Sequence, residues 1–174
     1  YYRYDIQGGS ENNNNHEKEP VSFLGVIPGR DEKPIAILGI RSFHENTRFL
    51  FKLYIARLRG RGVEKFVLDL RDNLGGRVEE LTGLLFFFMK KDDIAYTYVS
   101  RYKKVIYDTQ GILSSKEFNF PPTDQGFFRD IKVVLLMNKI SASCSEIFAG
   151  AMQDWKYTIV GERSFGKGIG QQTF

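Results

Sequence analysis

The chain has almost no cysteine, little histidine and no long apolar run. Its 174 residues include one cysteine, so no disulfide can form within the chain. His16 and His44 are the only histidines, too few for a multi-histidine metal site, and we expect no metal and no cofactor. The longest apolar run, LLFFFM at 84–89, is far shorter than the roughly 20 residues of a membrane-spanning helix. We therefore expect no membrane span and a fold held by its hydrophobic core.

The charges are nearly balanced. Lysine and arginine number 25 against 21 aspartate and glutamate, a formal net charge of +4 with histidine neutral. With 42% hydrophobic and 26% charged residues, the composition is typical of a folded globular domain. Arg57, Arg59 and Arg61 fall at the end of an expected helix, where cations suit the helix dipole. Because no larger basic cluster exists, we expect no nucleic-acid partner.

Residues 1–34 differ in composition from the rest of the chain. Gly8 to Asn15 is polar and of low complexity, and it has nothing to bury. We interpret 1–34 as an N-terminal extension or linker, partly disordered, with one short strand at 21–26. Because Tyr1 is neither Met nor the start of a signal segment, we expect the chain's own N-terminus to precede it.

From residue 35 to 174, apolar strand patterns alternate with amphipathic helix patterns, which predicts one layered α/β core domain. The pattern ends at Phe174 without a closing element, so we expect this core to be incomplete at its C-terminus. The expected strands are 35–40, 65–70, 94–100, 103–107, 132–137, 157–160 and 169–174, and the expected helices are 45–61, 77–89 and 145–155.

The first loop of chemical interest is DLRDNLGG at 69–76, at the end of an expected strand and before an expected helix. Gly75 and Gly76 expose backbone N–H groups near a positive helix end, where an oxyanion is stabilised. The alternative is an ordinary tight turn that contains an asparagine.

The second loop is SASCSE at 141–146, directly before a helix. Ser143 and Glu146 have the spacing of a capping box, a purely structural interpretation. The alternative is a nucleophilic serine exposed at the helix start, and spacing alone does not decide between the three serines. Cys144 has no histidine partner and reads as a small buried residue.

The third loop, GERSFGKG at 161–168, contains the candidate base. Neither histidine is well placed, but a lysine can act as base where burial lowers the pKa of its ammonium group. Lys167 lies between two glycines, so the backbone can pack closely around it. The spacing also approaches a phosphate-binding loop, but Gly168 stands where such loops carry Ser or Thr, which argues against nucleotide binding.

Three segments make the chain similar to a known family: VLDLRDNLGG (67–76), SASCSEIFAGAMQD (141–154) and VGERSFGKGIGQ (160–171). Over 35–174 the sequence resembles the C-terminal processing (tail-specific) serine proteases of peptidase family S41. The resemblance implies a crotonase-like or Clp-protease-like layered core of sheets and helices. It also implies a serine endopeptidase that cleaves extended polypeptides near their C-termini, outside the cytoplasm, in the periplasm or cell envelope or after secretion.

The resemblance further implies a Ser–Lys dyad that works through an acyl-enzyme. Carried over residue by residue, the family's site falls on the nucleophile Ser143, the base Lys167, the lysine-orienting Gln171, and oxyanion-hole amides from Gly75 or Gly76 and from Cys144. Two departures, Leu74 in place of the frequent proline and Ile140 in place of glycine, remove no dyad residue.

Two other functions stay open at this stage. The same fold can serve as a non-catalytic module that binds a ligand or peptide, and an acyl-CoA-handling crotonase relative is a third option without motif support. A peptide could bind by adding a strand to a sheet edge. The sequence leaves the oligomeric state open, a homo-oligomer included.

Overall fold

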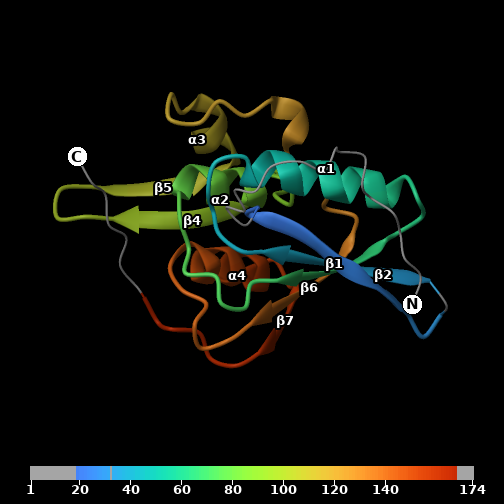
Figure 1. Cartoon of the computed structure of the whole chain (residues 1–174). Coiled ribbons are helices and arrows are strands. Elements are labelled where there is room, and N and C mark those ends of the chain that lie inside the picture. The colour runs from blue at the N-terminus through green and yellow to red at the C-terminus, as the bar shows by residue number, and fades with distance from the viewer. Residues whose placement is uncertain (1–18, 32, 168–174) are drawn as a thin grey trace, which may run out of the picture.

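The computed structural model describes residues 19–31 and 33–167. Its main sheet has five strands in the order β1-β2-β3-β6-β7, with β1 antiparallel to β2 and the other pairs parallel (Figure 1). The strands are β1 Val21–Pro28, β2 Pro34–Ile40, β3 Lys65–Asp69, β6 Lys132–Met137 and β7 Thr158–Gly161. This arrangement confirms the predicted layered α/β class.

Three helices connect the parallel strands: α1 Thr47–Arg59, α2 Val78–Phe86 and α4 Cys144–Asp154. The strand order advances in one direction from β2 to β7, so right-handed crossovers place these helices on one face of the sheet. Accordingly, α2 contacts both α1 and α4. A separate hairpin, β4 Ile94–Val99 and β5 Lys104–Asp108, extends beyond α2 (Figure 1).

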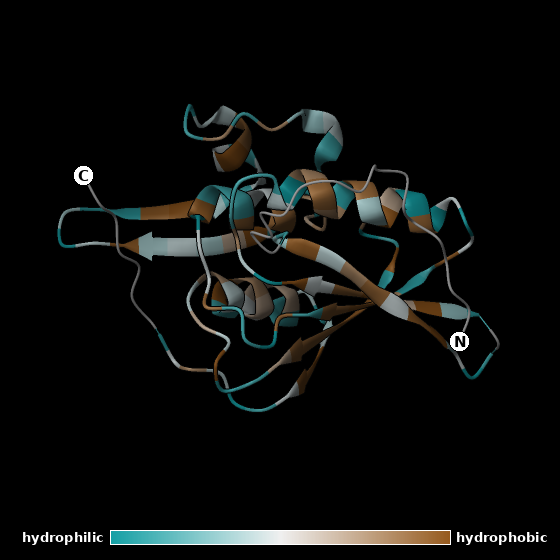
Figure 2. Cartoon of the chain, viewed as in Figure 1, coloured by the Kyte–Doolittle hydropathy of each residue, from teal (hydrophilic) through white to brown (hydrophobic). Residues whose placement is uncertain are grey.

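Burial alternates along the central strands. In β2, Ala36, Leu38 and Ile40 are fully buried, whereas Ile35 and Ile37 are only half-buried. The apolar runs predict buried strands, and the structure confirms this for the helix-covered face only. Figure 2 shows hydrophobic residues along the strands and a mixture of both kinds along α1, as expected of a helix that packs on one side.

Phenylalanine dominates the core between the helices and the sheet. Phe51 of α1 packs against Phe87, Phe88 and Phe128, and Phe88 also meets Phe148 of α4 edge-on with ring centroids 6.3 Å apart. All five rings are fully buried. Removal of such a ring typically costs about 3–5 kcal/mol, so this cluster holds the helices to one another without any disulfide.

The sequence predicted the long elements but not all the short ones. The strand expected at 21–26 is β1, and because it pairs with β2, this part of 1–34 belongs to the main sheet. The helix α3 Thr109–Ser114 and a single 3-10 turn at Pro122–Asp124 were expected as loop. The low-complexity stretch 8–15 and the strand expected at 169–174 lie outside the described residues. No helix in the described ranges is long and apolar enough to cross a membrane.

Candidate active site

The three loops singled out in the sequence follow three neighbouring strands of the main sheet. The loop with Gly75 and Gly76 follows β3, the serine loop follows β6, and the loop with Lys167 follows β7. Because β3, β6 and β7 run parallel, their carboxyl ends lie at one edge of the sheet. Segments far apart in the sequence therefore meet there.

Ser143 has an unusual backbone conformation at the start of α4. Its φ is 56° and its ψ is −118°, a region that non-glycine residues rarely adopt. Such a conformation costs about 1–3 kcal/mol and persists only where surrounding contacts enforce it. Two contacts come from Glu146, whose side chain accepts the Ser143 N–H at 2.9 Å and whose N–H donates to the Ser143 carbonyl at 2.8 Å.

The two neighbouring serines have structural contacts. The buried Ser141 hydroxyl donates to the Leu70 carbonyl at 2.8 Å, and the buried Ser145 hydroxyl donates to the Asn73 carbonyl at 3.0 Å. Ser143 is the only one of the three that is partly exposed. Of the three serines, burial thus favours Ser143 as the candidate nucleophile, a choice that the sequence spacing had left open.

Asn73 ties the glycine turn to its surroundings. Its buried side chain donates from Nδ2 to the Ile40 carbonyl and accepts the Gly75 N–H at Oδ1, both at 2.8 Å. Its own carbonyl accepts the Ala142 N–H at 3.0 Å, which joins the turn to the serine loop.

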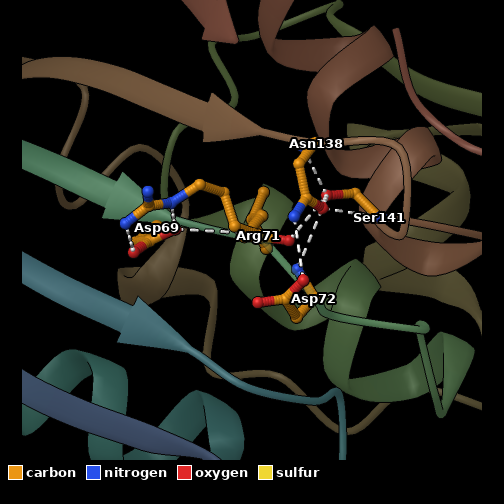
Figure 3. A network of polar contacts seen from close by, with 6 residues as sticks. Asp69, Arg71, Asp72, Asn138 and Ser141 are labelled. Carbon is orange, nitrogen blue, oxygen red and sulfur yellow. Dashed lines mark hydrogen bonds and ion pairs between the residues drawn. The ribbon is translucent and has the colours of Figure 1, made fainter. Parts of the chain in front are cut away.

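Asn138 makes a second connection between these two loops. Its Oδ1 accepts the Asp72 N–H at 3.1 Å and its Nδ2 donates to Asp72 Oδ1 at 2.8 Å (Figure 3). Beside it, buried Asp69 accepts two hydrogen bonds from the Arg71 guanidinium. Burial raises the pKa of the Asp69 carboxyl, but the hydrogen bonds and charge of Arg71 outweigh it and hold that pKa below its usual value.

The two glycines differ in what their amides can do. The Gly75 N–H already donates to Asn73, and Gly75 is buried. Gly76 is exposed, and neither its N–H nor that of Cys144 meets an acceptor within the described part of the chain. A β-carbon on Gly75 would lie 3.0 Å from the Cys144 nitrogen, so the turn packs directly against the start of α4. Of the two glycines proposed for an oxyanion hole, the geometry favours Gly76.

Cys144 is buried, as the sequence predicted. Its thiol donates to the Gly76 carbonyl at 3.2 Å. Burial raises the pKa of this thiol, so it stays protonated at neutral pH and is a poor nucleophile.

The loop at 162–167 packs against the serine loop. Glu146 accepts hydrogen bonds from the Ser164 hydroxyl at 2.7 Å, the Gly166 N–H at 2.6 Å and the Lys167 N–H at 2.9 Å. The Phe165 N–H donates to the Ser141 carbonyl at 3.0 Å.

These contacts bring the backbones of Ser143 and Lys167 together, and the Lys167 side chain is half-buried. No hydrogen bond between Lys167 Nζ and Ser143 Oγ is found in the described ranges. Gln171 lies outside the described residues.

An open cleft of about 350 Å³ adjoins the glycine turn, and Ser143 and Lys167 are not among its lining residues. The Leu74 side chain in the cleft is 70% exposed and Phe165 in the lysine loop is 68% exposed. Exposed apolar side chains are thus present in both the glycine turn and the lysine loop. The cleft is lined by Arg41, Ser42, His44, Asp72, Leu74, Gly75 and Gly76.

Two residues were not predicted to have roles across the loops. Glu146 was interpreted only as a helix cap, and Asn73 only as a turn residue. The capping-box spacing was a signal for the first, but the donors from the lysine loop are visible only in the folded chain.

The comparisons with known proteins agree with these motifs. The model of peptidase family S41 matches residues 34–174. The chain belongs to peptidase family S41. It is 37% identical over 156 residues to carboxyl-terminal-processing peptidase 2, chloroplastic, of Arabidopsis thaliana, which covers 88% of this chain and 28% of that protein. It is 32% identical over 161 residues to the carboxyl-terminal-processing protease of Picosynechococcus, and this match covers 90% of this chain and 36% of that protein.

A solved structure has the same fold. The photosystem II D1 C-terminal processing protease superposes with a TM-score of 0.68 at 25% identity, over 88% of this S41 chain and 39% of that chain. The S41 chain thus spans about a third of the length of the curated relatives that it matches.

Proposed function

We propose that this S41 chain forms part of the catalytic core of a serine endopeptidase, with Ser143 as nucleophile and Lys167 as general base. The observation that carries the proposal is the strained, partly exposed Ser143, which lies between the Gly75–Gly76 turn and the loop of Lys167. Backbone strain of this kind is common where a nucleophile must be held accessible at a helix start.

In the acylation step, Ser143 Oγ attacks the carbonyl carbon of the scissile peptide bond and its proton passes to the neutral amine of Lys167. Negative charge develops on the carbonyl oxygen, which the N–H groups of Gly76 and Cys144 would stabilise. When the tetrahedral intermediate collapses, the lysine gives the proton to the leaving amine. A water molecule, activated by the same lysine, then hydrolyses the ester on Ser143. Gln171 would orient the lysine.

The proposed substrate is an extended polypeptide cut near its C-terminus. The names of the plant and cyanobacterial relatives state carboxyl-terminal processing, which supports this choice. Among the strands of the described residues, β7 lies at one edge of the main sheet beside the site, so a bound peptide could add to it. We propose an extracytoplasmic or organellar location, because one relative is named as chloroplastic.

The proposal is tested on the intact protein with a fluorophosphonate probe and a peptide substrate. Wild type should be labelled and should cleave, and Ser143→Ala should lose both activities while it stays folded. Lys167→Met should also lose both, and so should Lys167→Arg, because a guanidinium is not a neutral base in this pH range. The exposed Lys139→Met, next to the serine loop, serves as the matched control and should keep at least half of the activity.

A folded wild-type protein that binds peptides yet is neither labelled nor active would contradict the proposal. That result would favour the non-catalytic peptide-binding module.

A further inference from the structure

One carboxylate, that of Glu146, connects the serine loop to the lysine loop. Its Oε2 accepts the N–H groups of both Ser143 and Lys167, each at 2.9 Å. Its Oε1 accepts the Ser164 hydroxyl at 2.7 Å and the Gly166 N–H at 2.6 Å. Both oxygens of the side chain are therefore used, each by two donors.

These contacts exceed what a helix cap needs. A capping box requires only that the glutamate accept the N–H of the cap residue, here Ser143. The other three donors belong to residues 164–167, on the far side of β7 in the sequence. Glu146 thus uses one contact for its own helix and three for the opposite loop.

The shared oxygen restricts the relative position of the two candidate catalytic residues. Two N–H groups that donate to one acceptor must lie within two hydrogen-bond lengths of each other. A shift of the Lys167 backbone that takes its nitrogen beyond this limit breaks at least one of the two bonds. Besides Glu146, the Phe165–Ser141 backbone bond is the remaining direct hydrogen bond between the two loops in the described ranges.

The chemistry of the site requires a carboxylate. All four partners are donors, and among the described residues Glu146 forms no ion pair, so N–H and O–H groups are the partners of its carboxylate there. A glutamine amide has the same size but would turn an NH₂ group toward two of these donors. It could satisfy one pair of donors, but not both.

We propose that Glu146 is a positioning residue that holds the Lys167 loop at the distance from Ser143 that proton transfer requires. This inference rests on the proposed function of the dyad. Glu146 does not touch the reacting atoms, and its effect is transmitted through the two backbones.

The test uses Glu146→Gln in the intact protein, with Glu162→Gln as the matched control. Glu162 is exposed in the same loop, and its carboxylate has no hydrogen bond to the described residues. In Glu146→Gln, the rate of fluorophosphonate labelling and kcat should fall at least tenfold while KM for the peptide changes less than twofold. Glu162→Gln should change all three less than twofold. Thermal unfolding must show both variants folded at the assay temperature.

A second measurement does not depend on activity. Amide hydrogen exchange at Gly166 and Lys167 should be slow in wild type and at least tenfold faster in Glu146→Gln, but unchanged in Glu162→Gln. Fast exchange in the wild type overturns the inference even if Glu146→Gln does not fold. Wild-type labelling rates in folded Glu146→Gln also overturn it. An unlabelled wild type with slow exchange at both amides would instead refute the proposed function and leave the loop contact established.

Discussion

Gly75 lies directly against Ser143: a β-carbon placed on Gly75 would come within 2.8 Å of the Cβ of Ser143. Gly75 also has a φ of 102°, which L side chains rarely adopt. The turn and the candidate nucleophile are therefore shaped to fit each other. A substitution of Gly75 should therefore displace Ser143.

Gly75→Ala should reduce peptide cleavage at least tenfold and destabilise the fold by about 1–3 kcal/mol, through backbone strain and the contact with Ser143. Gly150→Ala is the control, because Gly150 is exposed in α4 with nothing within 4 Å of its added β-carbon. That variant should stabilise the protein by about 0.5–1 kcal/mol and leave cleavage unchanged. Activity and urea unfolding of both variants check the prediction, and equal effects would contradict it.

The strain at Ser143 predicts a difference between two inactive variants. Ser143→Ala keeps a β-carbon at φ 56°, whereas Ser143→Gly relieves the strain. We expect Ser143→Gly to have a free energy of unfolding about 1 kcal/mol higher than Ser143→Ala, and both to lack cleavage. Urea unfolding of the pair measures this difference. If the alanine variant is the more stable one, Ser143 is not strained in solution.

Cys144 should prove dispensable as a side chain. Cys144→Ala should keep most of the activity, because the role proposed for this position lies in its backbone N–H. In the native protein, iodoacetamide should modify Cys144 slowly at neutral pH, since the thiol is buried and its pKa is raised. Rapid modification that stops cleavage, together with a dead Cys144→Ala variant, would point to a thiol nucleophile instead.

Acid should weaken the contact between the two loops. Burial raises the pKa of Glu146, but hydrogen bonds from Ser164 and from the amides of Gly166, Ser143 and Lys167 outweigh it, so the pKa lies below its usual value. A lowered carboxyl pKa adds stability above the unfolded value of about 4.3, and that stability is lost as pH falls through the folded value.

Glu146→Gln should therefore be less stable than wild type by about 1–3 kcal/mol at pH 7, and the difference should shrink below about pH 4. Urea unfolding between pH 7 and pH 3 measures it, with Glu162→Gln as the control that should show little difference at any pH. A difference that stays constant down to pH 3 would contradict the assignment.

The sequence predicted the secondary structure where the apolar pattern was long. Strands at 35–40, 65–70 and 132–137 and helices at 45–61 and 77–89 were found within a few residues of the expected ends. The short helix α3 was missed because its six residues contain too little periodicity to be distinguished from a loop. The half-exposed face of the sheet was also missed, because a continuous apolar run does not reveal which side the helices will cover.

The sequence by itself determined the family, because three motifs at 67–76, 141–154 and 160–171 occur in order along the chain. It also determined which three loops contain the candidate site residues. Only the tertiary structure decided which serine is partly exposed, which glycine amide meets no acceptor in the described part of the chain, and that Glu146 joins Ser143 to Lys167. The physical reason is that burial and hydrogen-bond partners depend on neighbours in space. The Ser145 hydroxyl is engaged because it donates a hydrogen bond to the Asn73 carbonyl, and the Gly75 N–H is engaged because it donates to the Asn73 side chain. No local sequence pattern shows which residues become neighbours in the folded chain.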